Sequence, residues 1–116
     1  MLKEKTFHSS AVDINYAEGP ANGPPLLLLH GITHRWQGFI QILPALTQNH
    51  HVFAPDFRGH GRSGRVHGAY RGEHFGSDVL AFIDQVIGGP AIVFGPAALR
   101  VVAVARAHVE EVSLTT

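Results

Sequence analysis

The chain has 116 residues, 45% of them hydrophobic, which is enough apolar material for one core, so we expect a single domain over residues 1–116. Lys plus Arg and Asp plus Glu are balanced at 9 each without any block of like charge, which argues against a nucleic-acid or acidic-membrane partner. No cysteine is present, so disulfides, thiolate catalysis and cysteine-based zinc sites are excluded.

The N-terminal segment MLKEKTFHSS contains no apolar run of signal-peptide length. The longest aliphatic runs, such as Leu26–Leu29, are far shorter than a membrane span. We therefore expect a soluble, cytoplasmic protein that has no membrane partner.

Short β-prone segments open the chain at Lys3–His8 and Val12–Tyr16, and the turn-forming residues after them predict a hairpin followed by a loop. Three later aliphatic runs are bounded by turn or breaker residues, which is typical of strands buried on both faces of a sheet. These runs are Leu26–Leu29, Val52–Ala54 and Ala91–Phe94. A further short strand is expected at Val112–Thr116.

Helical periodicity lies between these strands. Apolar residues recur at intervals of three and four from Trp36 to Leu46, where Pro44 predicts a kink or an early break. The same spacing runs from Phe75 to Ile87, with Asp78, Asp84 and Gln85 on the opposite side, and Pro96–Val109 predicts a more buried helix. Alternating strands and helices predict an open, doubly wound α/β fold with a mostly parallel sheet of about five or six strands and about three helices.

Nine histidines raise the question of a metal site. His30 and His34 are four residues apart, but His30 ends a strand-like run before Gly31, so the two rings are not expected to share a helix face. His50 and His51 are adjacent. We therefore expect surface or loop histidines, and neither a metal nor another cofactor.

Three loops at the carboxyl ends of the predicted strands form the candidate site, because ligands of such sheets bind there. The loops begin with His30-Gly31, with Asp56 in DFRGHGRS, and with Gly95 in GPAAL. Their order and spacing within LLLLHGITHRWQGF, HVFAPDFRGHGRSGRVHGAY, FGSDVLAFIDQV and PAIVFG resemble the N-terminal half of the α/β-hydrolase fold enzymes, such as esterases, epoxide hydrolases and haloalkane dehalogenases. The resemblance covers nearly all of the chain and implies a truncated fold of that type.

The resemblance also implies roles for individual residues. His30, Gly31 and Ile32 correspond to the family's oxyanion loop, in which the backbone N–H of Ile32 would be one donor. The loop Asp56–Ser63 is implied to be structural: its glycines permit positive φ, and Asp56 and Arg58 can hydrogen-bond to loop backbone.

The third loop departs from the family's pattern. An ungapped alignment on the G-x-S-x-G turn gives GPAAL, which places Ala97 at the nucleophile and Leu99 at the second glycine. A methyl group cannot attack a carbonyl, and an alignment in which the turn is deleted removes the nucleophile as well. The family's acid and general-base histidine have no counterpart before Thr116. Hydroxyls remain at Ser63, Ser77 and Ser113, but none of these serines lies in a nucleophile turn.

We therefore expect a non-catalytic, truncated or engineered α/β-hydrolase-derived domain that serves as a structural or assembly scaffold. One alternative is weak residual esterase-like activity through histidines near the oxyanion loop, such as His30, His34 or His60. Another is a module that binds a small hydrophobic ligand or a partner protein in the vestigial cleft. Because the sheet face that carries Trp36–Leu46 should be partly bare, we also expect a homodimer or larger assembly that buries it.

Overall fold

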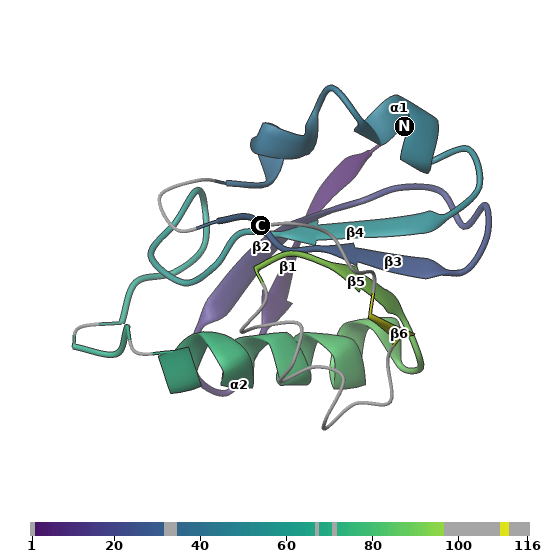
Figure 1. The fold of residues 1–116 in the computed structure, drawn as a ribbon. Helices are drawn as coiled ribbons and strands as arrows, with labels where there is room; N and C mark the ends of the chain where they lie inside the picture. Colours follow the sequence, from purple (N-terminus) through teal and green to yellow (C-terminus); the bar gives the residue numbers. More distant parts are fainter. Residues whose placement is uncertain (1, 32–34, 67, 71, 97–109, 112–116) are drawn as a thin grey trace.

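The computed structural model describes residues 2–31, 35–66, 68–70, 72–96 and 110–111. Within these residues, six strands form one sheet in the order β1-β2-β4-β3-β5-β6 (Figure 1). The strands are β1 (Lys3–His8), β2 (Asp13–Glu18), β3 (Pro25–Leu28), β4 (His51–Pro55), β5 (Ile92–Phe94) and β6 (Glu110–Glu111). β1–β2 and β2–β4 are antiparallel pairs, whereas β4–β3, β3–β5 and β5–β6 are parallel. The expected α/β sheet is confirmed.

The parallel strands are the most deeply buried part of the molecule. β3 lies between β4 and β5 and pairs with both of them. Leu27, Val52 and Val93, one from each strand, are fully buried. Such burial on both faces explains why these segments are continuous aliphatic runs rather than alternating ones.

The helical segment predicted from Trp36 to Leu46 is broken, but the break lies at residues 40–42 and not at Pro44, where a kink or early break was expected. The segment forms a 3₁₀ turn η1 (Trp36–Phe39) and, after an intervening turn, a four-residue helix α1 (Leu43–Leu46). Pro44 lies in the first turn of α1, where its missing N–H costs no hydrogen bond. Pro44 therefore helps to start a helix instead of kinking one.

The second predicted helix is confirmed. α2 (Gly72–Phe82) continues into one π-helical turn η2 (Ile83–Ile87). The helix ends at Gly88, which has a φ of 78° and so adopts the left-handed conformation that a glycine tolerates at a helix C-terminus.

The helices cover opposite faces of the sheet, with η1 and α1 on one side and α2 on the other (Figure 1). On the α2 side, Phe82 and Val79 pack with Leu27 and Leu29 of the β3 segment. On the other side, Trp36 and Leu43 pack with residues of alternate parity on the strands, Leu26, Leu28, Val52 and Ala54. Successive strand residues thus serve different cores, as the pleat requires.

Two predictions fall almost entirely beyond the described residues. Of the helix expected at Pro96–Val109, only Pro96 is described, and the strand expected at Val112–Thr116 is not described. Among the described helices, none combines the length and the apolarity needed to cross a membrane.

Candidate functional site

The carboxyl ends of β3, β4 and β5 lie at one edge of the sheet, because the three strands are parallel. They are followed by His30, Asp56 and Gly95 respectively. The chain goes from β3 to β4 over the η1–α1 face and then returns across β3 to β5 over the α2 face, so the strand order reverses at β3 (Figure 1). Such a reversal is where open α/β sheets place their ligands. The three loops therefore form the candidate site.

His30 lies at this edge and is only 2% exposed. Its Nδ1–H donates to the carbonyl oxygen of Gly31 over 2.7 Å, and its Nε2 accepts the backbone N–H of Phe57 over 2.9 Å. A carbonyl can only accept and an amide N–H can only donate, so these partners fix a neutral ring that carries its proton on Nδ1. His30 thus joins the loop after β3 to the loop after β4.

Asp56 makes a second connection between the loops and is 1% exposed. One carboxylate oxygen accepts the backbone N–H of Trp36 over 2.8 Å. The other accepts the side-chain amide of Asn15 over 3.0 Å and the backbone N–H of Arg62 over 3.1 Å. The carboxylate therefore holds the start of η1, strand β2 and its own loop, which confirms that Asp56 bonds to loop backbone.

The glycines of the same loop are needed for its shape. Gly59 and Gly61 have φ values of 75° and 51°, in the left-handed region that disfavours a side chain. A Cβ on Gly61 would lie 2.2 Å from Oδ2 of Asp56, and a Cβ on Gly59 would lie 2.5 Å from the Tyr70 ring. The predicted positive φ is confirmed, and close packing adds a second requirement for glycine.

Arg58 forms a buried ion pair that the sequence did not indicate. Its Nε and Nη2 donate to the two carboxylate oxygens of Asp78, each over 2.7 Å, and the two side chains are 3% and 7% exposed. The hydrogen bonds to Asp78 raise the pKa of Arg58 above its ordinary value. Nη1 donates to the carbonyl of Ala69, which confirms the expected bond to loop backbone. The placement of Asp78 on the solvent side of its helix is wrong, because the residue faces Arg58.

Ser63 has a structural role, as the sequence predicted. The hydroxyl donates to the carbonyl of Asp56 over 2.7 Å and accepts the backbone N–H of Asn15 over 2.9 Å. The side chain is buried. Ser77 is exposed on α2, and Ser113 lies outside the described residues.

Glu4 is a member of this network that sequence reasoning missed. One of its carboxylate oxygens accepts from the Asn15 amide over 3.0 Å and from the Trp36 indole N–H over 3.1 Å, and Arg62 lies 3.3 Å from the other oxygen. The hydrogen bonds from Asn15 and Trp36 hold the pKa of Glu4 below its ordinary value. No motif marks Glu4, which lies in an ordinary strand pattern far from the loops in sequence.

The third loop begins where β5 comes very close to β3. The N–H of Leu29 donates to the carbonyl of Phe94 over 2.8 Å, which extends the ladder to the strand ends. A Cβ on Gly95 would lie 2.6 Å from the Cβ of Leu29, so this position requires glycine. The expected oxyanion donor and nucleophile position, Ile32 and Ala97, lie outside the described residues, as do His34 and Leu99.

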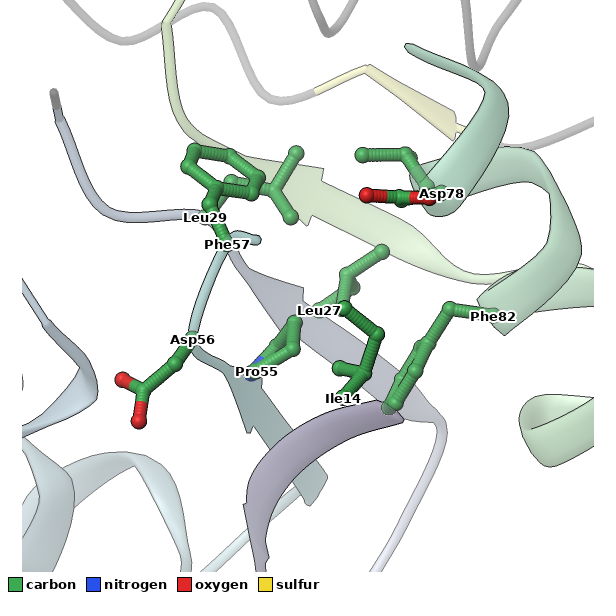
Figure 2. A pocket seen from close by; sticks show the side chains of 9 residues that line it. Ile14, Leu27, Leu29, Pro55, Asp56, Phe57, Asp78 and Phe82 are labelled. Carbon is green, nitrogen blue, oxygen red and sulfur yellow. The ribbon is translucent and has the colours of Figure 1, made fainter. Parts of the chain in front are cut away.

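A cavity of about 10 Å³ lies between the sheet and α2, below the strand ends (Figure 2). It is lined mainly by apolar side chains, and the Asp56 carboxylate points away from it. The volume corresponds to about one water molecule. The cavity is therefore a packing defect and does not support ligand binding there. Within the described part of the chain, no group of three or more His, Asp or Glu side chains is placed to hold a metal.

Comparisons with known proteins agree with this geometry. A family model described as "alpha/beta hydrolase fold" matches residues 24–95. The AB hydrolase superfamily protein YfhM of Bacillus subtilis is 37% identical over 82 residues, which are 68% of this chain and 29% of that protein. Epoxide hydrolase B of Mycobacterium tuberculosis is 38% identical over 76 residues, 63% of this chain and 21% of that protein.

The fold also matches solved structures. A mutant of the N-acyl homoserine lactonase AidH superposes with a TM-score of 0.85 at 24% identity, over 93% of this chain and 42% of that one. The chain thus spans less than a third of the curated relatives and less than half of this structure. At this level of identity, the structural match establishes the fold alone.

Proposed function

Since this chain belongs to the α/β-hydrolase fold family, we propose that it is a non-catalytic, hydrolase-derived domain whose strand-end loops stabilise the fold instead of performing hydrolysis. The observation that carries the proposal is the way His30 and Asp56 are used: the hydrogen bonds described above for these two buried groups either go to backbone of their own loop or tie that loop to another segment of the chain. Groups held in this way are not placed to exchange protons with a substrate.

The residue sequence of the third loop supports the proposal. Hydrolysis by this family's route requires a nucleophile on a strained turn after the strand that corresponds to β5. The chain has Gly95-Pro96-Ala97-Ala98-Leu99 there, and none of these side chains carries a nucleophilic atom. Pro is favoured at the first position of a helix, so the segment suits a relaxed join between a strand and a helix.

The hydrogen bonds of Ser63, which lies in the loop after β4, also support the proposal. A catalytic serine needs a hydroxyl that is hydrogen-bonded to a base. The Ser63 hydroxyl instead donates to the Asp56 carbonyl, and a backbone N–H from β2 bonds to its oxygen. An acyl group on this buried oxygen would break both bonds.

Hydrolysis of an activated nitrophenyl ester tests the proposal. Because nine histidines can catalyse such hydrolysis without any site, the control is the urea-unfolded protein at the same concentration. We expect the folded protein to be no faster than the unfolded one. Repeated turnover that requires the folded state would contradict the proposal. An Ala97→Ser variant, purified in parallel, tests whether a hydroxyl at this position is sufficient for activity. We expect no activity, because a serine nucleophile also needs an adjacent general base and none is identified for this position.

One observation favours a second candidate, weak esterase-like activity through His60. Its Nδ1 is hydrogen-bonded to the carbonyl of Arg58 over 3.0 Å, which orients the ring. The ring is half-buried and its centroid lies 5.3 Å from that of His30, at the candidate site. Histidine is the side chain that most often serves as a general base, so an oriented imidazole at this place is the best candidate for one among the loop residues.

The two candidates differ in their response to substitution. If His60 were a base, His60→Gln would remove the folded-state rate, while His8→Gln, an exposed histidine of the hairpin, would not. Equal rates for the protein and both variants would exclude this candidate. Circular dichroism of each variant shows whether the fold is retained.

A further inference from the structure

The loop between β2 and β3 contains the only Asn-Gly pair of the sequence, Asn22-Gly23. Both residues are exposed. The backbone nitrogen that follows an asparagine can attack the carbon of the asparagine side-chain amide. A glycine hinders this attack least, because it has no side chain. The pair therefore places a nucleophile and an electrophile in adjacent residues.

The structure leaves the attacking nitrogen available. In the described part of the chain, the N–H of Gly23 donates to no other group. A bonded N–H must give up its hydrogen bond before it can react, so an unbonded, exposed N–H is the more reactive one. The loop around it is nevertheless fixed. The N–H of Gly19 donates to the carbonyl of Val52 over 2.9 Å, and the N–H of His51 donates to the carbonyl of Pro24 over 3.0 Å.

Packing explains why a glycine follows Asn22. A Cβ on Gly23 would overlap the carbonyl oxygen of Asn49. This close approach of two backbone segments excludes every residue with a side chain from position 23. The fold thus keeps the least hindering residue directly after this asparagine.

The side chain of Asn22 has a structural role that the reaction would end. Its Nδ2 donates to the carbonyl oxygen of Thr47 over 2.8 Å. Thr47 is the C-cap of α1, where helix carbonyls lack a partner within the helix. A single exposed hydrogen bond between neutral groups has a small net strength, so it should slow the attack by no more than roughly tenfold.

The other asparagines, Asn15 and Asn49, are less favourably placed. Asn15 is buried, its side-chain amide donates to two carboxylates, and Tyr16 after it lies within the sheet. Asn49 is exposed, but it is followed by His50, whose side chain crowds the attack. Asn22 is therefore the position at which we expect the reaction first.

We propose that Asn22 is a site of spontaneous modification, in which the backbone nitrogen of Gly23 attacks Cγ of Asn22. The nitrogen gives its proton to solvent and bonds to Cγ, while the bond from Cγ to Nδ2 breaks and ammonia leaves with an added proton. Water then opens the resulting succinimide ring at either carbonyl, which gives aspartate or isoaspartate without any oxidant or reductant. The reaction goes beyond the proposed function, because it requires no activity of the protein.

The product should hold the loop to α1 less tightly. A carboxylate only accepts hydrogen bonds, so position 22 can no longer donate to the carbonyl of Thr47. The formal net charge at pH 7 changes from zero to one negative charge. Isoaspartate also adds a carbon atom to the main chain between Gly19 and Pro24, whose backbone groups are fixed by hydrogen bonds to β4.

Incubation of the folded chain at mildly alkaline pH in water enriched in ¹⁸O, followed by peptide mapping by mass spectrometry, tests the proposal. We expect one heavy oxygen at position 22, in isoaspartate as well as in aspartate. Isoaspartate distinguishes cyclisation from direct hydrolysis of the amide, which gives aspartate alone. The rate at Asn22 should exceed that at Asn49 by at least roughly tenfold.

Substitutions separate the reaction from its consequence. Asn22→Gln should stop the reaction at this position, because attack on the longer side chain forms a larger and less favourable ring, whereas Asn49→Gln should leave the rate at Asn22 unchanged. Asn22→Asp carries the charge of the product and lacks the donor, so its urea midpoint should fall. Asn49→Asp adds the same charge at an exposed position nearby and should lower the midpoint less.

Three results would overturn the proposal. The first is a folded chain in which Asn22 remains unchanged after the urea-unfolded chain has fully reacted there, because the fold would then protect the pair. The second is modification of Asn49 ahead of Asn22. The third is aspartate at position 22 without isoaspartate, because the side-chain amide would then be hydrolysed without attack by Gly23.

Discussion

The two segments that flank β4 are built by opposite means. The loop after β4, from Asp56 to Ser63, is held by buried hydrogen bonds and one buried ion pair, and it contains two glycines with positive φ. The segment before β4, from Trp36 to Leu46, has short helices, no charged residue, and exposed apolar side chains. Specific hydrogen bonds, an ion pair and positive φ values therefore restrict which residues the loop can contain. In the earlier segment, only the side chains that pack into the core are restricted in this way.

The largest effect is expected from breaking the ion pair of the loop. Arg58→Met removes one partner and leaves Asp78 buried without its cation, which should lower the free energy of unfolding by about 3–5 kcal/mol. Arg62→Met is the matched control, because Arg62 is 72% exposed and its contact with Glu4 should be worth less than about 1 kcal/mol. Urea unfolding measures both, and equal losses would show that the loop is not held by Arg58.

Glycine substitutions compare close packing with backbone conformation. Gly61→Ala combines a φ of 51° with a Cβ only 2.2 Å from the Asp56 carboxylate, so we expect a loss of about 3 kcal/mol. Gly68→Ala has a φ of 75° but no atom within 4 Å of the added Cβ, so conformation alone should cost about 1 kcal/mol. Similar losses in thermal or urea unfolding would mean that the Asp56 loop shifts easily to admit a side chain.

Acid should weaken the contacts through which Glu4 connects the two segments, with Trp36 on one side and Arg62 on the other. The folded-state pKa of Glu4 is lowered by hydrogen bonds from Asn15 and Trp36, so this carboxylate stabilises the fold above the ordinary glutamate pKa of 4.5, and its contribution is lost as pH falls through the lowered value. Trp36 is the only tryptophan, so its fluorescence should change below pH 4.5.

The fluorescence change should be absent from Glu4→Gln. It should persist in Asp84→Asn, which alters an exposed carboxylate on η2. An identical acid response in all three proteins would show that Glu4 does not report on Trp36.

The smallest effect is expected from an exposed apolar side chain between η1 and α1. Ile40→Ser changes a side chain that is 57% exposed, so the free energy of unfolding should change by less than about 0.5 kcal/mol. A loss as large as that of Gly61→Ala would show that Ile40 supports the core and is not a free surface residue.

Much of this architecture could be predicted from sequence because it rests on local patterns. The predicted aliphatic runs overlap the parallel strands, and the spacing from Phe75 to Ile87 corresponds to α2 and η2. These runs are Leu26–Leu29, Val52–Ala54 and Ala91–Phe94. The break in the helical segment Trp36–Leu46 was expected at Pro44 but lies at residues 40–42, because periodicity shows which residues face the core but not where the backbone stops being helical.

The network of the candidate site was less predictable because its partners are distant in sequence. His30 and Asp56 stand out by motif, but the bonds from Phe57 to His30 and from Trp36 to Asp56 require the fold. Asp78 was misplaced because helix periodicity assigns a carboxylate to solvent unless its cation is known. Glu4 carries no local signal for contact with an indole thirty-two residues away.

The central claim is that the strand-end loops contain no activated nucleophile, and labelling with an activated fluorophosphonate followed by intact mass measurement tests it most directly. The reagent bonds to serine hydroxyls that an adjacent base has activated. We predict that the folded protein gains no adduct under conditions that label a serine hydrolase completely. A stoichiometric adduct on Ser63 that unfolding abolishes would contradict the account, because a hydroxyl that bonds to backbone in the folded protein would then be an activated nucleophile.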